Sequence, residues 1–140
     1  MALSASQIEV GQIHEEVVVD NLTRTQLVQY AGASGDYNPL HSDEVFATQV
    51  AGYPTVFAHG MLTMGLTAKA VTNLVGDGRL AKYGVRFTAQ VWPGDTLTTR
   101  STVKELREED GVSFVDLDVE TVNQDGTTVV KGYATARIDP

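Results

Sequence analysis

The sequence contains no cysteine and no long apolar run. The absence of cysteine excludes a disulfide scaffold, a thiolate metal site and a Cys nucleophile, and it fits a reducing compartment. No apolar stretch approaches the roughly 20 residues of a transmembrane helix. Residues 1–6 lack the basic start and apolar run of a signal peptide, so we expect a cytoplasmic protein without a membrane partner.

Basic residues are scarce, since 10 Lys and Arg stand against 18 Asp and Glu, for a formal net charge of −8. Proteins bind nucleic acid through clustered Lys and Arg, so this charge argues against a nucleic-acid partner. A substrate that carries a phosphate would need a local basic patch. A length of 140 residues with 42% hydrophobic residues predicts one globular domain over residues 1–140.

The first half of the chain predicts helices. Thr23 and Gln26 have the spacing of a capping box, which predicts a helix over residues 24–33. Ser42 is expected to cap a second, short helix that begins directly after it. The segment 59–75 is apolar nearly all round, which predicts a helix that is buried on most of its sides.

The second half of the chain changes to strand patterns rich in Val, Thr, Tyr and Phe. The pairs Asp110-Gly111 and Asp125-Gly126 are typical of hairpin turns. We therefore predict an antiparallel meander of four strands that, with a short strand at 17–19, curls around the apolar helix in an α+β arrangement. The expected strands cover residues 83–91, 96–106, 112–122 and 127–138.

The stretch from Ser34 to Asp43 places an Asp, an Asn and a His in a segment with Gly and Pro. Asp36 and His41 are separated by Pro39, which restricts the backbone, so we expect both side chains to face one small volume. Imidazole gains and loses a proton near neutral pH, and a nearby carboxylate can orient it or share the proton transfer. The pair suits addition or removal of water across a carbon–carbon bond.

The segment Ala58-His59-Gly60-Met61 opens the apolar helix. The first backbone N–H groups of a helix have no partner within it, and they lie at the positive end of its dipole. Gly60 would let a ligand approach the backbone closely. The segment therefore predicts an oxyanion hole for a carbonyl oxygen that becomes negative in an enolate-type transition state.

Simpler interpretations of the same residues stay open. Asp36 can be a turn residue and His41 an exposed loop residue. Asp36 and His41 with Asp43 and Glu44 are also a loose match to a transition-metal site. His59 is interpreted as structural, bonded to a backbone group. We expect neither a metal nor a cofactor.

Residues 30–43, YAGASGDYNPLHSD, resemble the hydratase motif of the MaoC-like (R)-specific enoyl-thioester hydratases and dehydratases. The stretches 58–62, 85–87 and 93–97 are also similar to that family, so the resemblance covers nearly the whole chain. It implies a hot-dog fold, in which an antiparallel sheet wraps a central helix. It also implies reversible hydration of a trans-2-enoyl thioester to a (3R)-3-hydroxyacyl thioester in fatty-acid metabolism.

The resemblance implies a role for each residue of the motifs. Asp36 and His41 would be the catalytic pair, Asn38 would support them, and the backbone N–H of Gly60 would bind the thioester carbonyl. Two positions depart from the family pattern. Gln90 replaces a common Pro, and Ala68 stands where some members have a Ser that lines the site.

The resemblance also bears on carriers and partners. Lys82 and Arg86 are the basic residues expected near a phosphate of coenzyme A (CoA) or of an acyl carrier protein, although a solvated strand charge is an equal alternative. The run 59–65 looks most like the catalytic B subunit of mycobacterial 3-hydroxyacyl-carrier-protein dehydratases. A homodimer, or a heterodimer with a second hot-dog subunit, is therefore expected.

Two other functions remain open for a hot-dog chain. A thioesterase would place a catalytic carboxylate on the central helix, yet residues 61–75 contain no Asp or Glu. A non-catalytic subunit that only binds acyl chains would be expected to lack Asp36 or His41, and both are present. Both features favour the hydratase.

Overall fold

The computed structural model describes residues 3–140, in which five strands and two α-helices form the main elements. Three short helical turns, at Ala5–Gln7, Pro39–His41 and Phe46–Val50, lie in the connections. Within these residues, no helix has the length and apolar character needed to cross a membrane. In chain order the main elements are β1 (Ile13–Val19), α1 (Arg24–Ser34), α2 (Gly60–Val75), β2 (Leu80–Phe87), β3 (Leu97–Glu109), β4 (Val112–Val122) and β5 (Thr128–Ile138).

The five strands form one antiparallel sheet in the order β1-β3-β4-β5-β2. The predicted hairpins of β3, β4 and β5 are confirmed, and Asp110 and Gly111 have the positive φ angles, 52° and 78°, of a tight hairpin turn. The prediction of a four-strand meander is wrong, because β2 pairs with β5 rather than with β3. Strand β1 pairs with the edge of β3 where the meander would have placed β2.

The chain after β2 explains this topology. The strand ends at Phe87, four residues before the predicted end, and Val91 instead accepts a hydrogen bond from the backbone N–H of Ala58 at 2.8 Å. Residues 88–96 therefore pack beside the segment that precedes α2 and carry the chain across the sheet to begin β3. A hairpin between β2 and β3 cannot form along that path.

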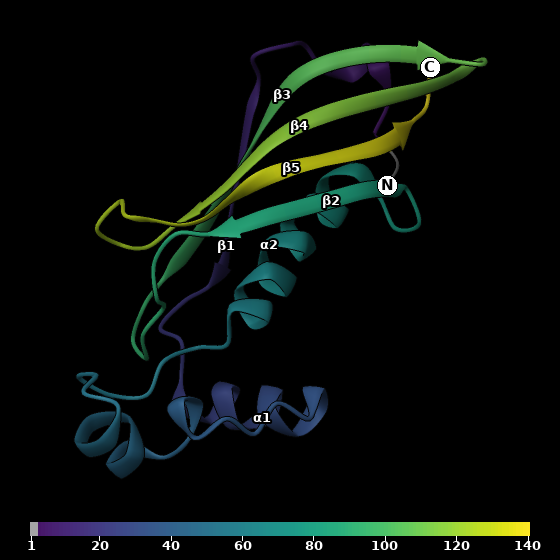
Figure 1. The fold of residues 1–140 in the computed structure, drawn as a ribbon. Coiled ribbons are helices and arrows are strands. Elements are labelled where there is room, and N and C mark those ends of the chain that lie inside the picture. The colour runs from purple at the N-terminus through teal and green to yellow at the C-terminus, as the bar shows by residue number, and fades with distance from the viewer. Residues whose placement is uncertain (1–2) are drawn as a thin grey trace.

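Helix α2 lies lengthwise on one face of the curved sheet (Figure 1). Its buried side faces the strands, with Val71 and Val75 completely buried against residues of β3, β4 and β5. The prediction that α2 is buried on most sides is wrong for the single chain, because one sheet covers only one side of a helix. Met61 is 57% exposed on the uncovered side.

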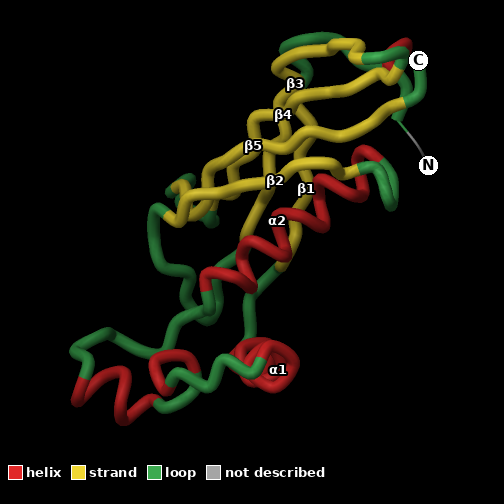
Figure 2. Tube along the Cα trace, turned by 45° about the vertical axis from the view of Figure 1, so that its right-hand side comes forward, coloured by secondary structure: helices red, strands yellow, loops and turns green. Residues whose placement is uncertain are grey.

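Helix α1 and the segment that follows it lie beyond the end of the sheet, near the first turn of α2 (Figures 1 and 2). The capping box of Thr23 and Gln26 is confirmed, and Leu27 is completely buried. The expected cap of the next short helix is wrong, because Asp43 rather than Ser42 accepts a hydrogen bond from the backbone N–H of Phe46. This outlying unit holds the Ser34–Asp43 stretch against the start of α2.

Candidate active site

The Ser34–Asp43 stretch uses its polar side chains to fix its own backbone. Gly35 ends α1 in the left-handed conformation, with φ 77°. The Asp36 carboxylate accepts a hydrogen bond from the backbone N–H of Asn38, and the Asn38 side chain accepts one from Leu40. Asn38 therefore caps the helical turn that carries His41, which is a supporting position for that side chain.

His41 is held with one ring nitrogen available for chemistry. Its Nδ1 lies 2.6 Å from the backbone carbonyl oxygen of Phe57. Because a carbonyl oxygen only accepts, Nδ1 carries the hydrogen and Nε2 keeps its lone pair. Burial is the main cause that lowers the pKa of His41 below its ordinary value of 6.5, and the Phe57 carbonyl opposes it. The ring is therefore mainly neutral at pH 7.

His59 lies directly against His41. The two rings stack with centroids 3.8 Å apart, and the ring of Tyr30 is 4.9 Å from that of His59. His59 is buried, and its Nε2 lies 3.0 Å from the backbone oxygen of Asp36. The prediction that His59 bonds a backbone group is confirmed. This bond ties the Asp36 backbone to the residue that precedes α2.

Asp36, His41 and His59 form a compact polar cluster in which one ligand atom from each lies within 4.8 Å of the others. These three residues could hold a metal ion, but stacked imidazole rings direct their in-plane lone pairs side by side rather than toward one point. The other two residues of the predicted metal alternative lie elsewhere. Asp43 caps a turn, and Glu44 bonds Arg24 at 2.6 Å.

The first turn of α2 offers a free backbone donor beside this cluster. Gly60 is its first residue, and the backbone N–H groups of Leu62 and Thr63 both donate to the His59 carbonyl. Among residues 3–140, the N–H of Gly60 has no acceptor. A Cβ atom at Gly60 would lie 3.3 Å from the ring of Phe87. The ring therefore packs directly over the glycine.

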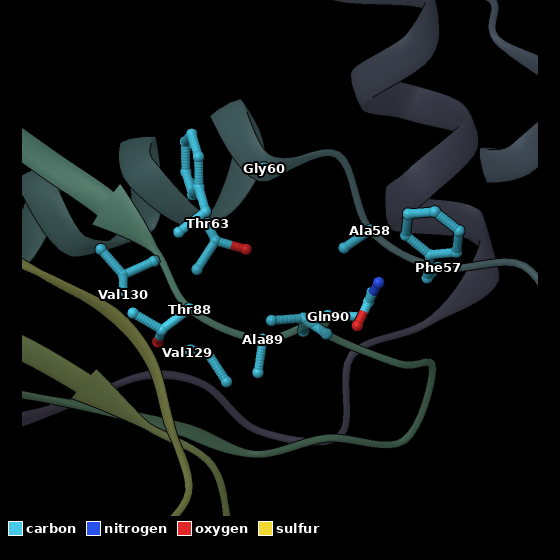
Figure 3. Close-up of a pocket in the computed structure, with 11 residues that line it drawn as sticks. Phe57, Ala58, Gly60, Thr63, Thr88, Ala89, Gln90, Val129 and Val130 are labelled. Carbon is cyan, nitrogen blue, oxygen red and sulfur yellow. The ribbon is translucent and has the colours of Figure 1, made fainter.

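A cavity of about 350 Å³ opens beside Gly60 (Figure 3). The cavity reaches Phe57, whose carbonyl holds His41, but neither Asp36 nor His41 lines it. The single chain therefore joins the candidate pair to the cavity through Phe57 without enclosing them together. The lining residues are Phe57, Ala58, Gly60, Thr63, Phe87, Thr88, Ala89, Gln90, Val91, Val129 and Val130.

Sequence reasoning missed most of this lining. Phe57 and Phe87 carry no motif of their own, although Phe57 stands next to the predicted Ala58–Met61 segment and Phe87 ends one of the family-like stretches. Gln90, the first departure from the family pattern, lines the cavity.

Lys82 and Arg86 are not brought to the candidate pair within this chain. Tyr83 of β2 bonds the backbone of α2, and side chains alternate along a strand, so Lys82 and Arg86 face the opposite side of the sheet. Arg86 lies opposite Lys131 of β5. Their predicted role as phosphate contacts stays a prediction.

Known proteins share this arrangement of a sheet, a helix and an outlying loop. The structure superimposes on R-hydratase PhaJ1 from Pseudomonas aeruginosa with a TM-score of 0.85, at 29% identity, over 99% of this chain and 86% of that one. The (R)-hydratase from A. caviae gives a TM-score of 0.83, over 96% and 99% of the two chains, also at 29% identity. The fold is the predicted hot-dog fold.

The sequence matches the model of the MaoC like domain over residues 6–124. An (R)-specific enoyl-CoA hydratase from Rhodospirillum rubrum is 34% identical over 84% of this chain and 80% of its own length. A 3-hydroxyacyl-thioester dehydratase Y from Mycobacterium tuberculosis is 40% identical over 61% of this chain. The chain belongs to the MaoC-like family, as predicted.

Some relatives are much longer. This chain covers 31%, 33% and 23% of the length of three of them, an M. tuberculosis dehydratase, an Arabidopsis thaliana enoyl-CoA hydratase and an M. tuberculosis enoyl-CoA hydratase.

Proposed function

We propose that this chain catalyses the reversible hydration of a trans-2-enoyl thioester to a (3R)-3-hydroxyacyl thioester in fatty-acid metabolism, carried by CoA or an acyl carrier protein. The observation that carries the proposal is the cluster of Asp36, His41 and His59, in which Nε2 of His41 keeps its lone pair and His59 directly precedes the free N–H of Gly60. The activities in the names of the relatives support it. Residues 1–140 would act as one cytoplasmic domain.

The chemistry follows from these groups. Asp36 and His41 hold a water molecule and together take one of its protons while its oxygen bonds to C3 of the enoyl group. Electrons move to the thioester oxygen, where the N–H of Gly60 stabilises the enolate. The pair then delivers one proton to C2, so one water is added and the pair is restored. Dehydration is the reverse.

A second hot-dog subunit would complete the site. Within the described residues 3–140, strand β2 is an edge strand that pairs with β5 alone, and Phe87 beside Gly60 is 49% exposed. Met61 on the open side of α2 is also exposed. Edges and apolar surfaces of this kind are normally covered in stable proteins. We propose a homodimer, or a heterodimer with a related subunit, that is joined along β2. The second subunit would cover the exposed side of α2.

The reaction class can be tested directly. The purified chain, alone and mixed with a candidate hot-dog partner, is given a short trans-2-enoyl-CoA and an enoyl carrier protein. We expect conversion to the hydroxyacyl thioester with no release of free thiol. Release of thiol would instead indicate a thioesterase. Binding of the substrate without conversion, in every combination, would indicate a non-catalytic acyl-binding subunit.

The pH dependence of kcat/KM should report the protonation of His41. Hydration needs Nε2 unprotonated, and burial lowers the pKa of His41, so the midpoint of the fall in activity toward acid pH should lie below 6.5. The measurement is kcat/KM between about pH 5 and 8, the range in which imidazole titrates. An acid limb whose midpoint lies above 6.5 would contradict a base with a lowered pKa.

A further inference from the structure

The cations of this acidic protein are not evenly distributed. Five of its ten Lys and Arg residues form ion pairs within residues 3–140, and Arg137 bonds a backbone oxygen. Of the four that remain, Lys69 lies on α2 and three lie on the outer face of β2 and β5, where two of them are directly opposite each other. Those three are Lys82, Arg86 and Lys131.

Arg86 and Lys131 face each other directly across β2 and β5. Like charges in this position repel and destabilise a sheet. Lys131 has the acidic Glu120 on its other side, but Glu120 is bonded to Arg100 of β3. An anion bound between Arg86 and Lys131 would remove the repulsion.

An aromatic ring adjoins these two cations. Tyr133 of β5 lies opposite Gly84 of β2, and a Cβ atom at Gly84 would come within 2.7–2.9 Å of the Tyr133 ring. One side of the ring therefore packs on the bare backbone of Gly84. Because Tyr133 is 50% exposed, its other side is open to a ligand.

These residues line a groove of about 490 Å³ on the outer face of the sheet. Its lining includes Gly84, Arg86, Thr88, Lys131 and Tyr133. Thr88 also lines the cavity that contains Gly60. The groove and the cavity thus share the residue that follows β2, and an elongated ligand that reaches from one to the other would pass the end of this strand.

We propose that this groove binds the 3′-phospho-ADP part of CoA, with its phosphates on Arg86 and Lys131 and its adenine on the open side of Tyr133. The pantetheine arm then passes Thr88 and delivers the thioester to Gly60. A flat aromatic surface beside two unpaired cations matches a nucleotide better than it matches the acidic side chains of a carrier protein. The placement of the thioester at Gly60 rests on the proposed function, whereas the binding of the nucleotide part in the groove does not.

The first test is binding of adenosine 3′,5′-bisphosphate to the whole chain by calorimetry. We expect binding by the wild type and a Kd raised about tenfold, which corresponds to 1.4 kcal/mol, in Arg86→Gln and in Lys131→Gln. The control is Lys104→Gln, a cation on the same face that pairs with Asp118. It should bind the probe as the wild type does.

The second test compares enoyl-CoA with the matching enoyl-pantetheine thioester. The wild type should favour the CoA substrate in kcat/KM, and Arg86→Gln and Lys131→Gln should reduce that preference about tenfold, mainly through KM. The Lys104→Gln variant should keep the wild-type preference.

The outcomes separate the two proposals. No binding of the bisphosphate, or an unchanged preference in both variants, overturns the groove while the hydratase stands. Turnover of the enoyl carrier protein without turnover of enoyl-CoA also overturns the groove and leaves the proposed hydratase function intact. Binding of the bisphosphate by a chain that hydrates no thioester supports the groove and overturns the proposed function.

Discussion

Substitution of His41 with Ala, or of Asp36 with Asn, is expected to slow hydration of an enoyl thioester by at least about a hundredfold, the range lost with an acid–base group. Ala removes the Nε2 lone pair that the Phe57 carbonyl keeps free. Asn is nearly the same size as Asp but carries no charge. Its side-chain oxygen can still accept the hydrogen bond from Asn38 that fixes the loop. The measurement is kcat with a short enoyl-CoA.

The controls separate chemistry from folding. Asp125→Asn makes the same change in an exposed turn after β4 and should leave kcat unchanged. Thermal unfolding of each variant reports whether the loop still packs, which matters most for His41→Ala because that change also removes the stack on His59. A stable, correctly folded Asp36→Asn variant with wild-type kcat would exclude the carboxylate from the reaction.

Substitution of Gly60 with Pro is expected to lower kcat roughly 10²–10³-fold, the effect of losing one oxyanion donor. Proline has no backbone N–H, yet it suits the first position of a helix, so α2 should still form. His59 has φ −58° and ψ 135°, an extended conformation that a following proline permits. The change therefore removes the free donor with little change to the helix.

Gly60→Ala is the matched control. It keeps the N–H and adds the same Cβ atom, which in both variants lies 3.3 Å from the half-exposed ring of Phe87. The kcat of the Gly60→Ala variant should lie much closer to that of the wild type than to that of the Gly60→Pro variant. Equal losses in the two variants would assign the effect to crowding against Phe87 and would remove the oxyanion role from Gly60.

The local features of this chain could be predicted from its sequence. The capping box at Thr23 and the Asp-Gly hairpin at Asp110 each depend on residues a few positions apart, and both are confirmed. The turn that holds Asp36 and His41 in one cluster is equally local. The catalytic roles that the resemblance implies for these two residues stay predictions.

The features that depend on distant segments could not be predicted in the same way. The pairing of β2 with β5 joins residues more than 40 positions apart, from Phe87 with Val130 to Leu80 with Ala136, and it depends on how residues 88–96 pack beside Ala58. The stack of His59 on His41, and the opposition of Arg86 and Lys131, are also contacts between segments far apart in the chain. The single sheet leaves one side of α2 uncovered, which an all-apolar pattern does not reveal.

The most direct test of the account is the configuration of the product. Wild-type protein, with a hot-dog partner if the chain alone is inert, hydrates a short trans-2-enoyl-CoA, and chiral chromatography identifies the 3-hydroxyacyl product. The proposed hydration gives the 3R enantiomer, formed by water held on the face that Asp36 and His41 define. A 3S or racemic product would contradict it, as would free thiol in place of a hydroxyacyl thioester.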